Sequence, residues 1–266
     1  MSVVTVVGGA TFALLDSVKN CEFSVQNESA DGASIKILDQ SPTFLKRRCT
    51  LSASTMSGSS LRVTNIDVTG LLMNSVEYSA DLLSGSMTIQ MSHKDGDAAE
   101  DFDAQPNVVG RVISGEVALA IPTSAYHAVA TRALSTTIAN LEFTLSLTLG
   151  GTTITLPVYS NSWTHVANYG DIQQVRFQYT GKAPYDGSTY LSSAPSASTS
   201  VLGCALSDPR ALLTYVFQTA ASGGAGKRFS GSCVIDSVRF SWNQNSVVMT
   251  EYSFKSHGAT TVGSPS

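Results

Sequence analysis

Apolar and polar residues alternate with a period of two along much of the chain, most clearly over residues 141–159. A period of two is the repeat of a β-strand with one buried face. Gly150-Gly151 interrupts the alternation, and two glycines between such runs are typical of a two-residue hairpin loop. We therefore predict a hairpin in this segment. Its predicted register pairs Leu147 with Ile154, Leu145 with Leu156 and Phe143 with Val158.

The opposite face of this predicted hairpin carries mostly hydroxyl groups. Its members are Glu142, Thr144, Ser146, Thr148, Thr153 and Thr155. Because successive side chains of a strand point to opposite faces of the sheet, these six residues are predicted to share one wet face.

Similar alternation recurs at residues 76–82, 87–91, 117–121 and 175–179. The segment 234–255 has two such runs that flank the polar residues 243–246, which predicts a second long hairpin. Residues 18–38 are interpreted as a third hairpin. The pattern as a whole predicts many strands paired with near neighbours in the sequence.

Helical signals are few. Residues 122–134 are alanine-rich and begin with a proline, and residues 207–221 have a serine cap before a proline, so both are predicted to be short helices. Residues 185–203 are serine-rich and aperiodic, which favours a long surface excursion or a segment that orders only on contact with a partner. The predicted fold class is mostly antiparallel β, a β-sandwich or barrel with one or two short flanking α-helices and long hairpins.

Domain organisation follows from the same pattern. We expect one elaborated β domain over residues 1–266, in which residues 40–110 and 182–206 could be insertions. Two tandem β subdomains that divide near residue 136 are the alternative.

Composition changes the picture of the surface. Only 14% of the 266 residues are charged, whereas 39 serines and 26 threonines make up about a quarter of the chain. A surface of small hydroxyls in place of lysine and glutamate is poorly suited to an isolated monomer at high concentration. It suits a protein that other copies of the same chain cover.

The net charge of −4 lies in one segment, because residues 94–103 carry five acidic side chains and one lysine. We expect a solvated loop there. A calcium-binding EF-hand loop that began at Asp95 would need glycine and glutamate where Glu100 and Pro106 stand. The basic run Lys46-Arg47-Arg48 is too short for the basic stripe of a non-specific nucleic-acid-binding protein.

No run of about 18 apolar residues predicts a membrane helix, and the first residues lack the features of a signal peptide. We therefore expect a soluble chain that is made in the cytosol and has no membrane partner.

The residues that usually carry catalysis or metal binding form no recognisable motif. The histidines show no HExxH spacing, and the glycine-rich run 223–228 lacks the spacing of a phosphate-binding loop. Cys21, Cys49, Cys204 and Cys233 form no CxxC pair, so each is expected to be a small buried residue. We predict no catalytic residue, no metal and no cofactor, and therefore no enzyme.

Two alternatives stay open. Cys49 follows three basic residues that would lower the pKa of its thiol, so it is a candidate for a disulfide between subunits. Trp163, Tyr159 and Tyr169 could line a sugar-binding groove in a β-sandwich lectin. Against that groove, the aromatic residues follow the strand period, as core residues do.

The closing segment GSCVIDSVRFSWNQNSVVMTEYSFKSHGATT, residues 231–261, resembles bacteriophage tail tube proteins. The long hairpins, the predicted helix near residues 207–221 and the short tail after Gly258 are similar to that family in architecture. The resemblance rests on no strict motif.

The resemblance implies a virion protein that is assembled in the host cytoplasm into stacked, usually hexameric, rings of the phage tail. Its partners would be further copies of itself, the tail terminator, tape measure and baseplate or tip proteins, and a sheath if the tail is contractile. Genomic DNA would pass through the lumen during ejection without specific binding, past a hydroxyl-rich face such as residues 142–155. The alternative is a non-tubular virion or β-sandwich binding protein, such as a decoration, baseplate, host-attachment or carbohydrate-binding module.

Overall fold

The computed structural model describes residues 3–7, 18–31, 42–56, 63–70, 73–77, 82–96, 101–120, 142–149, 152–167, 169–170, 173–181, 204–206, 209–219, 225–243 and 249–264. Thirteen strands in one continuous, antiparallel sheet make up most of this part of the chain. They are β1 (Val3–Val7), β2 (Val18–Asp31), β3 (Pro42–Met56), β4 (Val63–Gly70), β5 (Met73–Glu77), β6 (Leu82–Asp95), β7 (Pro106–Ala120), β8 (Glu142–Leu149), β9 (Thr152–Val166), β10 (Gln174–Gly181), β11 (Leu213–Gln218), β12 (Arg228–Asn243) and β13 (Met249–Gly263). The prediction of a mostly antiparallel β fold is confirmed.

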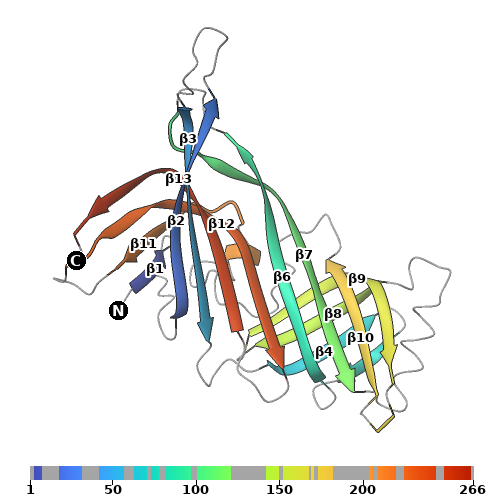
Figure 1. Cartoon of the computed structure of the whole chain (residues 1–266). Helices are drawn as coiled ribbons and strands as arrows, with labels where there is room; N and C mark the ends of the chain where they lie inside the picture. Colours follow the sequence, from blue (N-terminus) through green and yellow to red (C-terminus); the bar gives the residue numbers. More distant parts are fainter. Residues whose placement is uncertain are drawn as a thin grey trace.

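The sheet folds back on itself at both ends. Its hydrogen-bonded order is β2-β3-β13-β12-β6-β7-β10-β9-β8-β4-β5, and β11 joins β1 to β12 outside this path. In Figure 1 one broad layer, which we call the main layer, contains the long strands β2, β3, β13, β12, β6 and β7. Strands β8, β9 and β4 cross behind β6 and β7. The arrangement is β-sandwich-like.

Strand β12 joins the main layer to the β1–β11 pair because it bends. The register of its pairing with β13 shifts between Ser230 and Ser232 and again between Ile235 and Ser237. Before the bend β12 pairs with β11, and after it with β6. Such bulges turn a strand without ending it.

The core lies between the layers and follows the period of two. On β6, for example, Met87, Ile89 and Met91 are at most 3% exposed. Across the layers, the ring of Phe23 on β2 stacks on Tyr215, Phe217 and Phe229, with ring centroids 4.8–6.0 Å apart. This aromatic packing fixes β11 against β2, although nearly 200 residues separate them.

Two of the three hairpin predictions are confirmed. Strands β8 and β9 pair Leu147 with Ile154, Leu145 with Leu156 and Phe143 with Val158, which is the predicted register. Strands β12 and β13 form the hairpin predicted over 234–255. The alternating runs at 87–91 and 175–179 lie within β6 and β10, and the run at 117–121 lies within β7 up to residue 120, the last one described there. The run at 76–82 begins in β5 and ends at the first residue of β6.

The helix predicted over residues 207–221 is wrong. Leu213, Tyr215 and Phe217 alternate with partly exposed residues in strand β11, which pairs on both sides. A serine-proline start favours a helix locally, but burial against the β2 layer requires a period of two. Residues 204–206 form a single helical turn, while the predicted helix 122–134 and the excursion 185–203 lie outside the described residues.

The hairpin predicted over residues 18–38 is also wrong. Strand β2 runs from Val18 to Asp31 without turning and pairs along its length with β3. Its polar second half, with Asn27 and Glu28, indicated a turn because such residues are common in turns. Here Asn27 and Glu28 instead pair with Arg47 and Lys46.

Candidate functional site: a hydroxyl-lined sheet face

Polar side chains line up across five neighbouring strands on the face of the main layer that is opposite to the core. The strand registers align Asn20, Ser54, Glu251, Arg239 and Thr88 in one row, and Glu22, Ser52, Ser253, Ser237 and Gln90 in the next. The intervening residues, such as Ala53, Ile89 and Val238, are buried in the core. Strict alternation on every strand therefore creates one continuous polar face.

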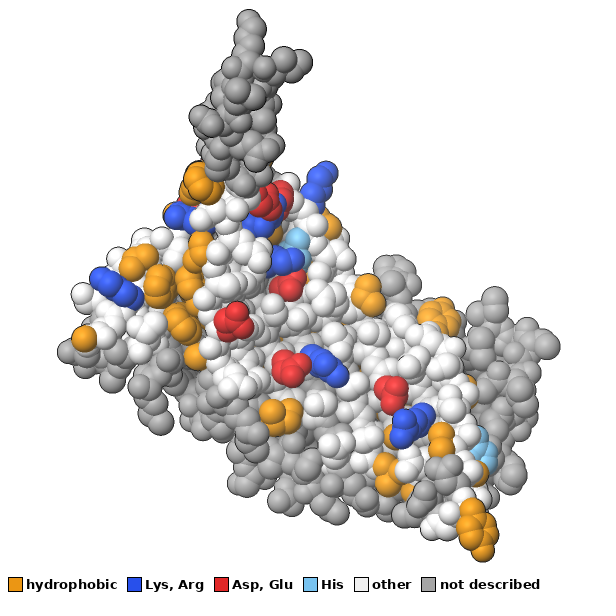
Figure 2. Space-filling model, viewed as in Figure 1, with side chains coloured by type: hydrophobic (Ala, Val, Ile, Leu, Met, Phe, Trp, Pro, Cys, Tyr) orange, Lys and Arg blue, Asp and Glu red, His pale blue; other side chains and the backbone are white. Residues whose placement is uncertain are grey.

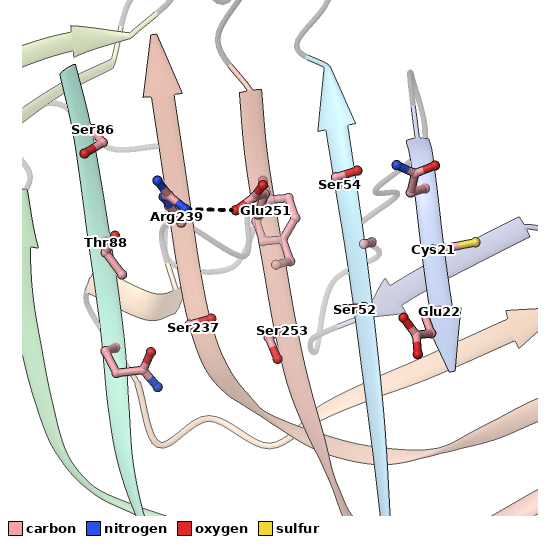
Figure 3. A pocket seen from close by; sticks show the side chains of 14 residues that line it. Cys21, Glu22, Ser52, Ser54, Ser86, Thr88, Ser237, Arg239, Glu251 and Ser253 are labelled. Atoms are coloured by element: carbon pink, nitrogen blue, oxygen red, sulfur yellow. Dashed lines mark ion pairs between the residues drawn. The ribbon is translucent and has the colours of Figure 1, made fainter. Parts of the chain in front are cut away.

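This polar face is hollowed. A shallow depression of about 670 Å³ lies over β2, β3, β13, β12 and β6 and is lined mainly by serine, threonine, glutamine and asparagine. Figure 3 shows Ser52, Ser54, Ser86, Thr88, Ser237 and Ser253 on successive strands. The depression is open to solvent, and we call it the trough.

The same face continues onto β7, β10 and β9. The register places Ser86, Glu116, Gln178 and Ser162 side by side on four consecutive strands. Gln178 donates a hydrogen bond to Glu116 over 3.4 Å and accepts one from Ser162 over 3.3 Å. The polar face thus extends over eight strands from β2 to β9.

Charges on the polar face are few and of both signs. Figure 2 shows single acidic and basic side chains scattered over a surface of uncharged groups. Arg239 and Glu251 on the adjacent strands β12 and β13 pair inside the trough over 3.8 Å, and both side chains are more than half exposed. Without a basic stripe this face offers no strong counterion-release binding to a polyanion.

The basic run 46–48 meets the acidic segment at one end of this layer, a contact that no sequence motif predicted. Arg47 donates two hydrogen bonds to the Asp103 carboxylate, and Arg48 pairs with both Asp95 and Glu28. The hydrogen bonds and charge of Arg48 hold the pKa of Asp95 below its ordinary value. The sequence did contain a signal for this contact, because its one basic run and its one acidic segment carry opposite charges and could pair.

The solvated loop expected at residues 94–103 is wrong at both ends, because Lys94 and Asp95 belong to β6 and residues 101–103 pack against β3; residues 97–100 lie outside the described residues. Residues 101–105, which we call the wedge, lie between β3 and β13, where those strands separate. The backbone N–H of Arg47 donates to Phe102, that of Ala104 donates to Arg47, and that of Gly258 donates to Ala104. Ala104 is 2% exposed, so the wedge is part of the packed structure.

The cysteines are free thiols at different depths. Cys49, Cys204 and Cys233 are buried as predicted, but Cys21 is only half-buried. Burial raises the pKa of Cys233. Cys49 is 4% exposed and its backbone N–H donates to the Ser256 hydroxyl over 3.1 Å. A disulfide between subunits through Cys49 stays a prediction, and it would require the β3–β13 contact to open.

The six candidate wet-face residues fall on β8 and β9. The register pairs Ser146 with Thr155 and Thr148 with Thr153, while Thr144 faces Pro157 and Glu142 faces Tyr159. Their positions alternate with the buried Leu145 and Leu156. Their side chains lie outside the described residues, so their role stays a prediction.

The aromatic residues considered for a sugar-binding groove are not gathered into one. Trp163 packs on the buried ring of Phe177 with centroids 4.7 Å apart, while Tyr169 is fully exposed in a turn. Within the described ranges, no three His, Cys, Asp or Glu side chains are placed to hold a metal ion. In the same part of the chain, no helix has the length and apolar character needed to cross a membrane.

Comparison with known proteins identifies no family for the chain. No protein-family model matches the chain, and the search of curated proteins finds no significant match. The trough and the strand edges are therefore the basis for a functional proposal.

Proposed function

We propose that the chain is a phage tail tube protein that assembles into rings and stacks of rings, with the polar face of the main layer toward the lumen. The observation that carries the proposal is the eight-strand face of hydroxyl and amide groups, with few charges of mixed sign. A wall of this chemistry stays wet and gives DNA no cationic stretch at which to stop.

The edge of the sheet supports self-association. Among the described strands, β2 pairs on one side with β3 and has no neighbour on its other side over 14 residues. A long unpaired edge tends to recruit another strand. Val25 on this edge is 49% exposed and would be covered by a neighbouring copy. Adding copies edge to edge would continue the polar face around a closed lumen.

Electron microscopy tests assembly directly. Purified protein, examined by negative stain over a range of concentrations, is expected to form rings or hollow filaments. Discrete monomers or trimers at every concentration would contradict the tube and favour a decoration or host-attachment protein.

The orientation of the polar face needs its own experiment. The double variant Ser52→Arg/Ser237→Arg adds two cations inside the trough and is expected to make assembled tubes retain double-stranded DNA at low salt. The matched control Ala259→Arg/Thr261→Arg places the same charge on exposed residues of β13. Equal DNA retention by both variants would show that the trough does not face the lumen.

A further inference from the structure

His93 on β6 lies where β6, β12 and β13 meet, and its side chain is 7% exposed. Its Nε2 is 3.0 Å from the backbone oxygen of Ile235, and its Nδ1 is 3.3 Å from Nζ of Lys255. A carbonyl oxygen only accepts and an ammonium group only donates. Nε2 therefore carries the proton, Nδ1 accepts from Lys255, and this geometry requires a neutral imidazole.

One carboxylate oxygen lies close to both Lys255 and His93. Oδ1 of Asp236 is 2.8 Å from Lys255 Nζ and 3.4 Å from His93 Nδ1. A proton on Nδ1 would turn that atom from acceptor to donor. His93 and Lys255 would then lose their hydrogen bond, repel each other and compete for Asp236.

The other charges near His93 are already engaged. Asp95, two residues further along β6, is held by Arg48 of β3, which also pairs with Glu28 of β2. Burial and the charge of Lys255 lower the pKa of His93, and the Ile235 hydrogen bond and the charges of Asp236 and Asp95 only partly oppose this. His93, Lys255, Arg48 and Asp95 line one cavity of about 380 Å³, which leaves space for these side chains to rearrange.

This cluster lies beside the point where β13 leaves β3. The pair of Lys255 and Thr50 is the last one between the two strands. Three residues later, the N–H of Gly258 donates to Ala104 of the wedge over 2.9 Å. Ala104 also lines the cavity that contains His93. A displacement of Lys255 therefore acts on the strand segment that holds the wedge.

We propose that His93, Lys255 and Asp236 form an acid-sensitive latch that keeps the wedge fixed between β3 and β13. The latched state holds His93 neutral, whereas the opened state lets it bind a proton near the ordinary histidine pKa of about 6.5. Opening is therefore unfavourable above that pH. As the pH falls below it, the protection given by the latch decreases about tenfold per unit, until the lower pKa of the latched form is reached.

Amide hydrogen exchange at pH values from 8 to 5, corrected for the intrinsic exchange rate, tests the latch. The amides of Gly258 and Ala104 are expected to lose protection below pH 6.5, while that of Phe177 in the distant β7–β10 pairing keeps it. In His93→Gln, whose amide can make both hydrogen bonds without titrating, the loss is expected to disappear. The matched control His165→Gln removes an exposed histidine on β9 and should leave the loss unchanged.

Three results would contradict the latch: the same loss in His93→Gln, a uniform loss that includes Phe177, or a wild-type imidazole of His93 that titrates at or above its ordinary pKa. The last measurement uses nuclear magnetic resonance on the wild-type chain, so it does not depend on a variant that folds. Because the latch belongs to a single chain, its failure leaves the ring proposal unaffected, and the absence of rings leaves the latch unaffected.

Discussion

At the scale of the residue, close contacts in the main layer leave some positions without space for a side chain. Gly115 on β7 pairs with Met87 of β6 and lies close to the backbone oxygen of Ser86, which accepts a hydrogen bond from the Tyr179 hydroxyl over 3.2 Å. The phenol of Tyr179 is fully buried, and burial raises its pKa. It occupies the space in which a Cβ at position 115 would lie.

Gly115→Ala is therefore expected to destabilise the fold by about 1–3 kcal/mol through overpacking. A Cβ there would approach the Ser86 backbone oxygen to 2.1 Å and the Tyr179 hydroxyl to 2.4 Å. The matched control is Gly110→Ala on the same strand, whose Cβ would first meet Ser92 at an ordinary 3.6 Å. Urea unfolding of both variants checks this, and equal stabilities would show that the contact at Gly115 is not as close as the structure has it.

The ion pair of Arg48 and Asp95 makes a second prediction at this scale. Because the pKa of Asp95 is lowered in the folded chain, the stability that it contributes is complete above its ordinary pKa of about 3.9 and decreases as the pH falls through the folded value. Both side chains are more than 30% exposed, so their coupling is expected to stay below about 1 kcal/mol. A double-mutant cycle with Arg48→Met and Asp95→Asn, measured at pH 7 and pH 3, should give a smaller coupling at pH 3 than at pH 7.

At the scale of the element, hairpin registers decide which residues share a face. Leu149 of β8 pairs with Thr152 of β9, which leaves two residues for the connection. A two-residue hairpin loop requires backbone conformations that β-branched residues disfavour. The register in turn keeps Leu145, Leu156 and Val158 in the core.

Replacing Gly150-Gly151 with Val-Val is therefore expected to disturb this register and to prevent soluble assembly. Asn-Gly at the same two positions is the control, since it suits such a loop and should leave the protein unchanged. Gel filtration and thermal unfolding measure the two effects. Normal rings and normal stability in the Val-Val variant would rule out this hairpin as a determinant of assembly.

At the scale of the whole molecule, β12 joins the main layer to β11, and among the described strands the main layer ends at the unpaired edge of β2. Natural sheets often protect such edges with lysine, and β2 has only Lys19 among its 14 residues. We expect rings to form through this edge, because β5, the strand at the other end of the sheet order, is only five residues long.

Val25→Lys is expected to stop assembly while the monomer stays folded, since Val25 is 49% exposed and a buried charge between two copies is costly. Gln26→Lys adds the same charge to the exposed polar side of the same strand and should still assemble. Light scattering and negative stain compare the two variants. Rings formed by Val25→Lys would move the subunit interface away from this edge.

The period of two by itself determined where most strands run and which residues face the core. It also determined the register of the β8–β9 hairpin, because a short loop and two apolar rows leave one pairing that buries both. These are local properties, which neighbouring residues decide together. The sequence predicted that a hydroxyl-rich face exists but not where it lies, because the serine and threonine residues of β3, β6, β12 and β13 that form it are far apart in the sequence.

Tertiary structure alone decided the rest. It made residues 213–218 a strand, because aromatic packing on Phe23 outweighs a local helix signal. It paired β2 with β3 in place of a tight turn, and brought Arg47 and Arg48 against acidic residues about 50 positions away. Long-range pairing depends on which surfaces become buried together, and no short window of sequence contains that information.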